Sequence, residues 1–188
     1  MAGFDLTALF QQLLVYREQT NNWSQLGPWL QQHINTATLP PFEQLPLTPQ
    51  TYTRHRIAQE NPSDSSKTHS SFEALMVRWD QQVQTRIHGH PPFSFYHVIT
   101  GVFEMELFTR TNKGLQFVKK RLFLPSDNTW CVGPVGQYDN FIHRVTCLEA
   151  GLTFHVYSDD AQKGVCFELA TDEFTQPTPP QLKSCQKI

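Results

Sequence analysis

The chain has 188 residues, a formal net charge of −2 and no long cluster of lysine or arginine. A chain of this length can bury a sizeable core in one domain. The charge pattern argues against nucleic-acid binding and against a polybasic membrane patch. No apolar run approaches the roughly 20 residues needed to span a bilayer, and the first residues lack the basic region of a signal peptide. We therefore expect a cytoplasmic protein that binds neither nucleic acid nor membrane.

The four cysteines are widely spaced and form no C-x-x-C pair; they are Cys131, Cys147, Cys166 and Cys185. Paired spacing marks most structural zinc sites, and disulfide scaffolds are typical of much smaller secreted domains. We therefore expect reduced thiols, most of them packed as small hydrophobic side chains.

Residues 1–45 are expected to form helices and a strap that belong to the same domain as the rest of the chain. Residues 4–35 read as helical, because leucine and phenylalanine recur at helical spacing after Asp5, which can cap the first turn. A second short helix is expected over 24–34. These helices most simply cover an open side of a sheet. The Pro-rich segment that follows, 39–49, is expected to lie across the domain.

From residue 46 to 175 the pattern changes to short strands and turns, and 176–188 reads as a polar tail. Residues 59–71 are expected as a solvated loop, and Thr111–Gly114 as a hairpin turn. Many short strands with turn signals between them predict an all-β sandwich or barrel and not βαβ units. The segments that are rich in β-branched or aromatic residues are 52–57, 72–79, 84–88, 94–99, 102–109, 116–124, 129–132, 143–147, 152–157 and 165–169.

Two histidines one residue apart, His88 and His90, are candidates for one half of a metal site. Residues i and i+2 of a strand point to the same face, so both imidazoles can reach a common ion if this segment is extended. The alternative is a pair of surface imidazoles in a loop that ends in proline. A glycine- and proline-bearing turn later leads into His143 at the start of a strand, and an antiparallel barrel can bring that strand beside the first.

These residues, in this order, resemble the two motifs of the cupin superfamily. The first motif usually carries a glutamate between the H-x-H and Gly101, and that place here holds Ser94. The resemblance implies an all-β fold: a cupin (double-stranded β-helix) barrel with N-terminal α-helices packed against it. A first motif without this carboxylate resembles that of one cupin branch, the thiol dioxygenases, and specifically that of the cysteine dioxygenase family.

Further matches to that family imply the roles of the site residues. His88, His90 and His143 would hold one Fe(II) per chain, and L-cysteine would be oxidised with O₂ to cysteine sulfinic acid. Tyr52-Thr-Arg54 resembles the segment whose arginine binds the substrate carboxylate, with Arg56 as the competing choice on the same strand face. Trp79 resembles an active-site tryptophan.

Thr153, His155 and Tyr157 resemble the family's hydroxyl–imidazole–phenol relay, and alternate residues of a strand can form such a chain. The animal enzymes carry a cysteine at the place of Ser94, which cross-links to the relay tyrosine, so this chain should have a free phenol. Ser158-Asp159 departs from the family's Ser-Pro step. Phe93 and Phe95 are candidates for the pocket wall together with Tyr52 and Trp79, and for each of the four the alternative is an aromatic side chain of the core.

Several alternatives stay open. The chain could be a 3-mercaptopropionate or other small-thiol dioxygenase, although that branch typically has glutamine where Arg54 stands. It could be a zinc or nickel cupin of hydrolytic or isomerising chemistry, since three histidines also suit zinc. It could also be a metal-binding cupin without turnover. The expected partners are a small thiol and O₂, with a monomer or a weak homo-oligomer as the assembly.

Overall fold

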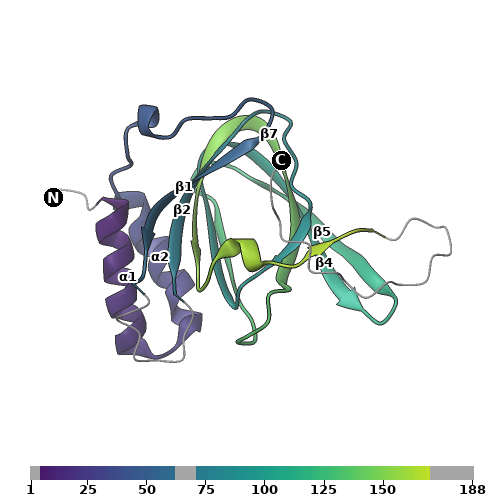
Figure 1. The fold of residues 1–188 in the computed structure, drawn as a ribbon, viewed down its shortest axis with the longest axis horizontal. Helices are drawn as coiled ribbons and strands as arrows, with labels where there is room; N and C mark the ends of the chain where they lie inside the picture. The colour runs from purple at the N-terminus through teal and green to yellow at the C-terminus, as the bar shows by residue number, and fades with distance from the viewer. Residues whose placement is uncertain (1–4, 62–70, 170–188) are drawn as a thin grey trace.

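The structure, a computed structural model, is an antiparallel β-barrel with two helices against one side (Figure 1). It describes residues 5–61 and 71–169, so the expected tail and most of the expected 59–71 loop lie outside the described residues. Four short 3-10 turns occur at Trp23–Gln25, Ile34–Thr36, Phe42–Gln44 and Ala161–Lys163. The helices and strands are α1 (Leu6–Thr20), α2 (Leu26–His33), β1 (Tyr52–Gln59), β2 (Glu73–Trp79), β3 (Ile87–His90), β4 (Phe93–Thr111), β5 (Gly114–Phe123), β6 (Asn128–Val132), β7 (Asn140–Tyr157) and β8 (Cys166–Phe167).

Two long strands, β4 and β7, form the spine of the barrel. They pair antiparallel from Ser94 opposite Tyr157 to Leu107 opposite His143. The C-terminal half of β7 also pairs with β2, and its N-terminal half also pairs with β3. Strand β1 extends the sheet beyond β2, while β5 and β6 pair with β4. The β4–β5 hairpin projects from the side of the barrel opposite the helices (Figure 1).

The sequence predicts two strands where each of these long strands lies, and this detail is wrong. Gly101 and Gly151 lie between the segments that are predicted as separate strands, but they face each other where β4 and β7 bend together. Gly101 has a φ of 87°, which favours glycine, and the β4–β7 register shifts on both sides of it. A Cβ on Gly151 would collide with the carbonyl of Thr100. The glycines thus permit bends within continuous strands, which is why local sequence suggested ends.

Alternate residues of the sheet face two separate cores. On β2, Ala74 and Met76 face the helices, whereas Leu75, Val77 and Trp79 face the barrel interior. The helix-side core also contains the apolar face of α1, from Leu6 through Phe10 to Leu13, as predicted for helices that cover a sheet. The fold class expected from the sequence, an all-β barrel with N-terminal helices packed against it, is confirmed.

Helix α1 begins as predicted, because the side chain of Asp5 accepts a hydrogen bond from the backbone N–H of Ala8 at 2.7 Å. Pro28 lies in the first turn of α2, where a missing N–H costs nothing. The Pro-rich segment after α2 is anchored by Leu45, which is buried in the helix-side core and whose carbonyl accepts from Arg78 at 2.8 Å.

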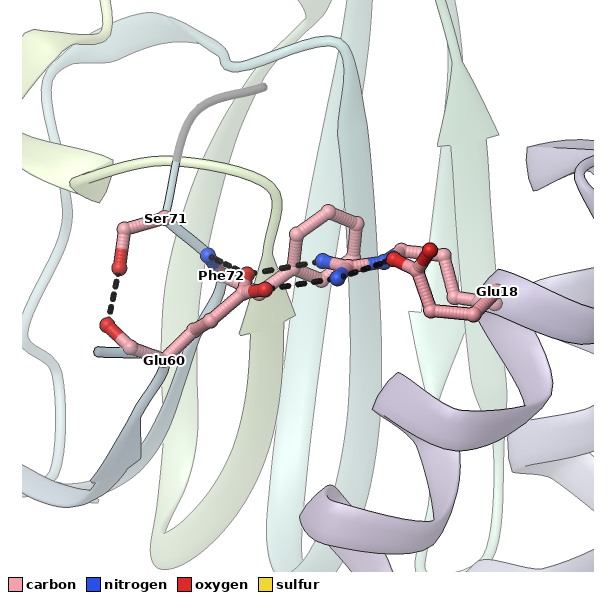
Figure 2. Close-up of polar contacts among 5 residues, drawn as sticks. Glu18, Glu60, Ser71 and Phe72 are labelled. Carbon is pink, nitrogen blue, oxygen red and sulfur yellow. Dashed lines mark hydrogen bonds and ion pairs between the residues drawn. The ribbon is translucent and has the colours of Figure 1, made fainter. Parts of the chain in front are cut away.

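A partly buried ion pair fixes α1 to the sheet (Figure 2). Arg17 donates to both carboxylate oxygens of Glu60, at 2.7 and 2.8 Å, and to Glu18 at 2.8 Å. Its guanidinium also lies 4.7 Å from the ring centroid of Phe72, and the backbone N–H of Phe72 donates to Glu60 at 3.1 Å. Burial alone would raise the pKa of Glu60, but the hydrogen bonds from Arg17 and Phe72 hold it below its ordinary value.

The cysteines depart in part from the expectation of four reduced thiols. Cys131 and Cys147 are free, but Cys166 is disulfide-bonded, so the prediction is wrong for Cys166. Cys185 lies outside the described residues. None of the described helices combines the length and the hydropathy needed to cross a membrane.

Candidate metal centre and adjoining pocket

Three histidines from two neighbouring strands meet inside the barrel. His88 and His90 lie on the same face of β3, and His88 is directly opposite His143 of β7. One nitrogen from each of the three imidazoles falls within a cluster 4.8 Å across. The residue between the pair must be Gly89, because a Cβ there would lie 2.5 Å from the backbone of Asp139. The segment before His143 therefore packs directly behind β3 and helps to align the two strands.

Backbone carbonyls set which nitrogen of His88 and of His143 is available. Nδ1 of His88 lies 2.8 Å from the carbonyl oxygen of Arg86, and Nδ1 of His143 lies 2.8 Å from that of Phe141. A carbonyl only accepts, so each Nδ1 carries the proton and each Nε2 presents a lone pair. Carbonyls that hold the outer nitrogen are the usual arrangement behind metal-ligating imidazoles.

The donor set fits a divalent transition metal. Nε2 of His90 lies 3.4 Å from Nε2 of His143, and Nδ1 of His90 has no hydrogen-bond partner among the described residues. Two nitrogens that each lie about 2.1 Å from one ion are separated by about 3.4 Å at a tetrahedral angle. Burial lowers the pKa of His88 to about 4 and keeps the pKa values of His90 and His143 well below the ordinary value. All three imidazoles are therefore neutral near pH 7, as metal ligation requires.

The backbone at Phe141 is unusual. Its φ is 49°, in a region that an aromatic residue with a Cβ rarely adopts. In this conformation its carbonyl accepts from His143, and its ring lies edge-on to the His143 imidazole at 4.8 Å. Such strain costs about 1–3 kcal/mol and persists only where the surroundings enforce it. Here it accompanies the orientation of the His143 ring.

A pocket adjoins the histidine cluster and encloses about 380 Å³ of empty space, its open mouth included. Among the described residues that line it there is no aspartate or glutamate. The lining residues are Tyr52, Arg54, Leu75, Val77, Trp79, Thr85, His88, Tyr96, His143, Val145, His155 and Tyr157.

Arg54 and Arg56 differ clearly in their surroundings. Arg54 lines the pocket with its guanidinium 5.5 Å from the ring centroid of Tyr52. No hydrogen bond or ion pair to Arg54 occurs within residues 5–61 and 71–169. Arg56 instead lies 3.4 Å from the buried carboxylate of Glu73 and is absent from the pocket lining. The guanidinium of Arg54 is thus the one that a ligand in this pocket can reach.

Thr153, His155 and Tyr157 form a continuous hydrogen-bonded chain, hereafter the relay. Oγ1 of Thr153 lies 2.7 Å from Nε2 of His155, and Nδ1 of His155 lies 2.8 Å from the hydroxyl of Tyr157. Burial lowers the pKa of His155 to about 3 and raises the pKa of Tyr157, so both groups are neutral near pH 7. The Tyr157 ring stacks on the His90 ring with centroids 5.0 Å apart, which places the end of the relay beside the histidine cluster.

The indole of Trp79 donates to the Thr153 end of the relay. Its Nε1 can only donate, and it lies 2.8 Å from Oγ1 of Thr153. The Thr153 hydroxyl hydrogen then has two acceptors, Nε2 of His155 at 2.7 Å and the carbonyl of Val77 at 3.5 Å. When the hydrogen goes to His155, Nδ1–H of His155 donates to Tyr157. The phenol hydrogen of Tyr157 is thereby left for the pocket.

Two of the candidate wall residues lie elsewhere, and the sequence missed others. Of the two alternatives for Phe93 and Phe95, the structure shows core packing: both belong to the helix-side core, because they lie on the opposite face of β4. The alternate residues, Ser94 and Tyr96, point to the same face of the sheet as the relay side chains, and Tyr96 lines the pocket. Strand parity relative to Ser94 was the signal that could have identified Tyr96.

The departure at Ser158-Asp159 has a defined structural role. The Ser158 hydroxyl accepts from the backbone N–H of Phe93 at 3.0 Å. The Asp159 carboxylate accepts from the hydroxyl of Tyr138 at 2.6 Å and from Lys163 at 2.9 Å. Because Tyr138 precedes Asn140 at the start of β7, these bonds fasten the turn after the relay to the segment before His143.

No protein-family model matches this chain, and no curated protein sequence matches it. Solved structures of cupins are similar in fold. An RmlC-like cupin from Shewanella frigidimarina NCIMB 400 is 14% identical over 57% of this chain and 75% of that chain, with a TM-score of 0.40. A cupin superfamily protein from Desulfitobacterium hafniense DCB-2 is 11% identical over 65% of this chain and 90% of that chain, with a TM-score of 0.44.

Oxalate decarboxylase from Bacillus subtilis is 17% identical, with a TM-score of 0.46. The match covers 66% of this chain and 30% of that chain. Likenesses at this level concern the fold alone and carry no functional argument. The strand pairing described above shows the fold by itself: a curled antiparallel barrel with helices packed on one side and three histidines grouped inside it.

Proposed function

We propose that this protein is a thiol dioxygenase whose substrate is L-cysteine. The observation that carries the proposal is the charge pattern of the pocket. The pocket is lined by two neutral imidazoles of the three-histidine cluster, His88 and His143, and by the Arg54 guanidinium, which has no hydrogen-bond or ion-pair partner among the described residues. The described lining has no carboxylate. A ligand that brings both a thiolate and a carboxylate complements this pattern.

The metal group would be one Fe(II) per chain, held by His88, His90 and His143. A ferrous ion supplies the redox chemistry that O₂ needs to react with sulfur. Since the protein provides no anionic ligand here, charge balance favours a substrate whose thiol loses its proton at the site. The overall reaction is R–SH + O₂ → R–SO₂H, in which both oxygen atoms end on sulfur and no further reductant is consumed.

Arg54 would bind the substrate carboxylate. A guanidinium presents a planar fork that matches a carboxylate in two hydrogen bonds. Tyr52 and Trp79 wall the same pocket, with ring centroids 4.7 Å apart, and exclude water from it. Tyr157 would direct its phenol hydrogen to the reacting sulfur or oxygen, and the relay would hold that phenol in one orientation.

Metal analysis and oxygen consumption test the proposal. Purified protein should contain iron, consume O₂ with L-cysteine, and form cysteine sulfinic acid in equal molar amount. Protein that binds iron stoichiometrically but takes up no O₂ with cysteine or with 3-mercaptopropionate would refute the dioxygenase assignment. A metal-binding cupin without turnover would then be the better description.

Substitutions at Arg54 and His143 test the individual roles. Arg54→Ala should raise the cysteine KM by about 100-fold, the loss of two charge-assisted hydrogen bonds of about 1.5 kcal/mol each, and should leave iron bound. Arg56→Ala is the matched control and should keep the wild-type KM, because Arg56 pairs with Glu73 outside the pocket. His143→Ala should lose iron. If iron stays, another residue is the third ligand, with His155 as the first to test.

A further inference from the structure

Glu73 is a buried carboxylate beside the pocket that neither the proposed reaction nor the relay uses. It lies on β2 directly opposite Tyr157 of β7. It is two residues before Leu75 and therefore points to the same face of the strand, toward the barrel interior. Its side chain is only 2% exposed. A carboxylate at such a depth loses its hydration, so it depends on the groups that pair with it.

Two groups pair with the Glu73 carboxylate. The backbone N–H of Ala161 donates to one oxygen at 2.8 Å, and the other oxygen lies 3.4 Å from Nε of Arg56. Within residues 5–61 and 71–169 no other cation forms an ion pair with it. Burial still raises the pKa of Glu73 above its ordinary value, so these contacts replace only part of the lost hydration. Arg56 is therefore the cation on which this carboxylate depends.

Arg56 stands next to the pocket although it does not line it. Arg54 and Arg56 share one face of β1, about 6.6 Å apart along the strand. They lie directly opposite Val77 and Leu75, and both of these line the pocket. The Arg56 side chain is 51% exposed, so packing alone does not fix it. A guanidinium on such a long, flexible stem can turn toward the pocket when nothing holds it.

We propose that Glu73 is a positioning residue that acts through Arg56: its carboxylate holds the Arg56 guanidinium outside the pocket and leaves Arg54 as the one guanidinium for a substrate carboxylate. This inference rests on the proposed function and deepens it. The substrate class would be thiols with a single carboxylate, as in L-cysteine. A thiol with two carboxylates would leave one of them unpaired, because the described lining has no lysine and no second arginine.

The test compares the binding of two related thiols without turnover. 3-Mercaptopropionate carries one carboxylate, and mercaptosuccinate carries a second carboxylate on the carbon that bears the sulfur. Protein loaded with Fe(II) is titrated with each thiol by calorimetry in the absence of O₂. The measured quantity is the ratio of the two Kd values, since a general change in the pocket affects both. The wild type should bind mercaptosuccinate no more tightly than 3-mercaptopropionate.

Glu73→Gln removes the charge but keeps an oxygen that can accept from the N–H of Ala161, so it should melt close to the wild type. Because it frees Arg56, the Kd of mercaptosuccinate relative to that of 3-mercaptopropionate should fall about tenfold, the usual effect of gaining a hydrogen bond between charged groups. Glu73→Met cannot hold Arg56 either and should give the same ratio. Adding Arg56→Ala to Glu73→Gln should restore the wild-type ratio, and Arg56→Ala alone should not change it.

A purely structural role of Glu73 predicts a lower melting temperature and equal changes in both Kd values. An unchanged ratio in Glu73→Gln and Glu73→Met would therefore overturn the inference. A changed ratio that persists after Arg56→Ala is added would overturn it as well, because the effect would not act through Arg56. A wild-type protein that already prefers mercaptosuccinate, or that binds neither thiol, would also overturn it.

These results are separable from those on the proposed function. If the wild-type protein binds 3-mercaptopropionate but consumes no O₂ with cysteine, the dioxygenase assignment fails while the ratio of the Kd values still decides the role of Glu73. If O₂ is consumed and the ratio does not respond to Glu73→Gln, the dioxygenase assignment stands and Glu73 has no part in selecting the substrate.

Discussion

Replacing Thr153 with valine removes the hydroxyl that joins Trp79 to His155 and nearly preserves the side-chain shape. Thr153 is completely buried, so neither partner can turn to water. The indole N–H of Trp79 loses its acceptor at 2.8 Å, and Nε2 of His155 loses its donor at 2.7 Å. Each unpaired buried group costs about 1–3 kcal/mol, and the added methyl regains about 0.8 kcal/mol. We expect a net loss of about 3 kcal/mol in the free energy of unfolding.

The same change should slow catalysis without weakening substrate binding. Once the hydroxyl is gone, nothing favours one tautomer of His155, and the Tyr157 phenol can turn its hydrogen toward Nδ1 and away from the pocket. A lost preference of about 1 kcal/mol corresponds to roughly a fivefold change in population. We therefore expect kcat to fall about fivefold, with the cysteine KM within a factor of two, because Arg54 is untouched.

Urea denaturation and steady-state oxygen uptake measure the two effects. Thr153→Ser is the matched variant, since it keeps the hydroxyl, and it should restore kcat and most of the stability. A valine variant with wild-type stability would show that Thr153 does not bridge the two partners. A serine variant as impaired as the valine variant would show that shape, and not the hydroxyl, is what matters.

Three further changes test other parts of the structure. Arg17→Met should destabilise the protein by about 2 kcal/mol at pH 7, since it removes the charged hydrogen-bond partner of the partly buried Glu60 carboxylate. Because the folded-state pKa of Glu60 is lowered, this share of stability exists above the ordinary carboxyl pKa and is lost as pH falls through the lowered value, so urea titrations of wild type and variant should converge in acid. Ser94→Cys should form a thioether with Tyr157 after incubation with iron, cysteine and O₂, since the two residues lie directly opposite on adjacent strands. Mass spectrometry would show the loss of two hydrogen atoms. An unchanged mass would contradict the register. Gly151→Ala should fail to fold or lose several kcal/mol because of its collision with the Thr100 carbonyl, whereas Gly114→Ala, with nothing within 4 Å, should lose only about 1 kcal/mol; similar melting temperatures for the two would refute the argument.

The fold class was predictable because strand periodicity and turn residues are local signals. The same local reading failed at Gly101 and Gly151, where the partner strand decides whether a glycine ends a strand or bends it. The Asp5 cap and the Thr111–Gly114 turn were predictable because, unlike the bends at the two glycines, each depends only on hydrogen bonds within a few residues.

The candidate site was predictable to the extent that its residues share a strand. His88 with His90, and Thr153 with His155 and Tyr157, follow from the alternation of side chains. The pairing of His88 with His143 was only one possibility that an antiparallel barrel allows, and the resemblance singled it out, because no local signal joins residues so far apart in the chain. Tyr96 escaped notice because its place in the pocket wall is a property of the packed interior, and Phe93 and Phe95 stayed open between wall and core because their face of β4 was not fixed by sequence alone.

Strand β7 carries both His143 and the relay. The distance between them is therefore fixed by the number of residues that separate them along one continuous strand, which bends at Gly151. Insertions or deletions in the projecting β4–β5 hairpin leave that distance unchanged, so this hairpin is free to vary in length and composition. Relatives of this protein can thus diverge widely at that end of the barrel and still keep the distance between the third histidine and the phenol.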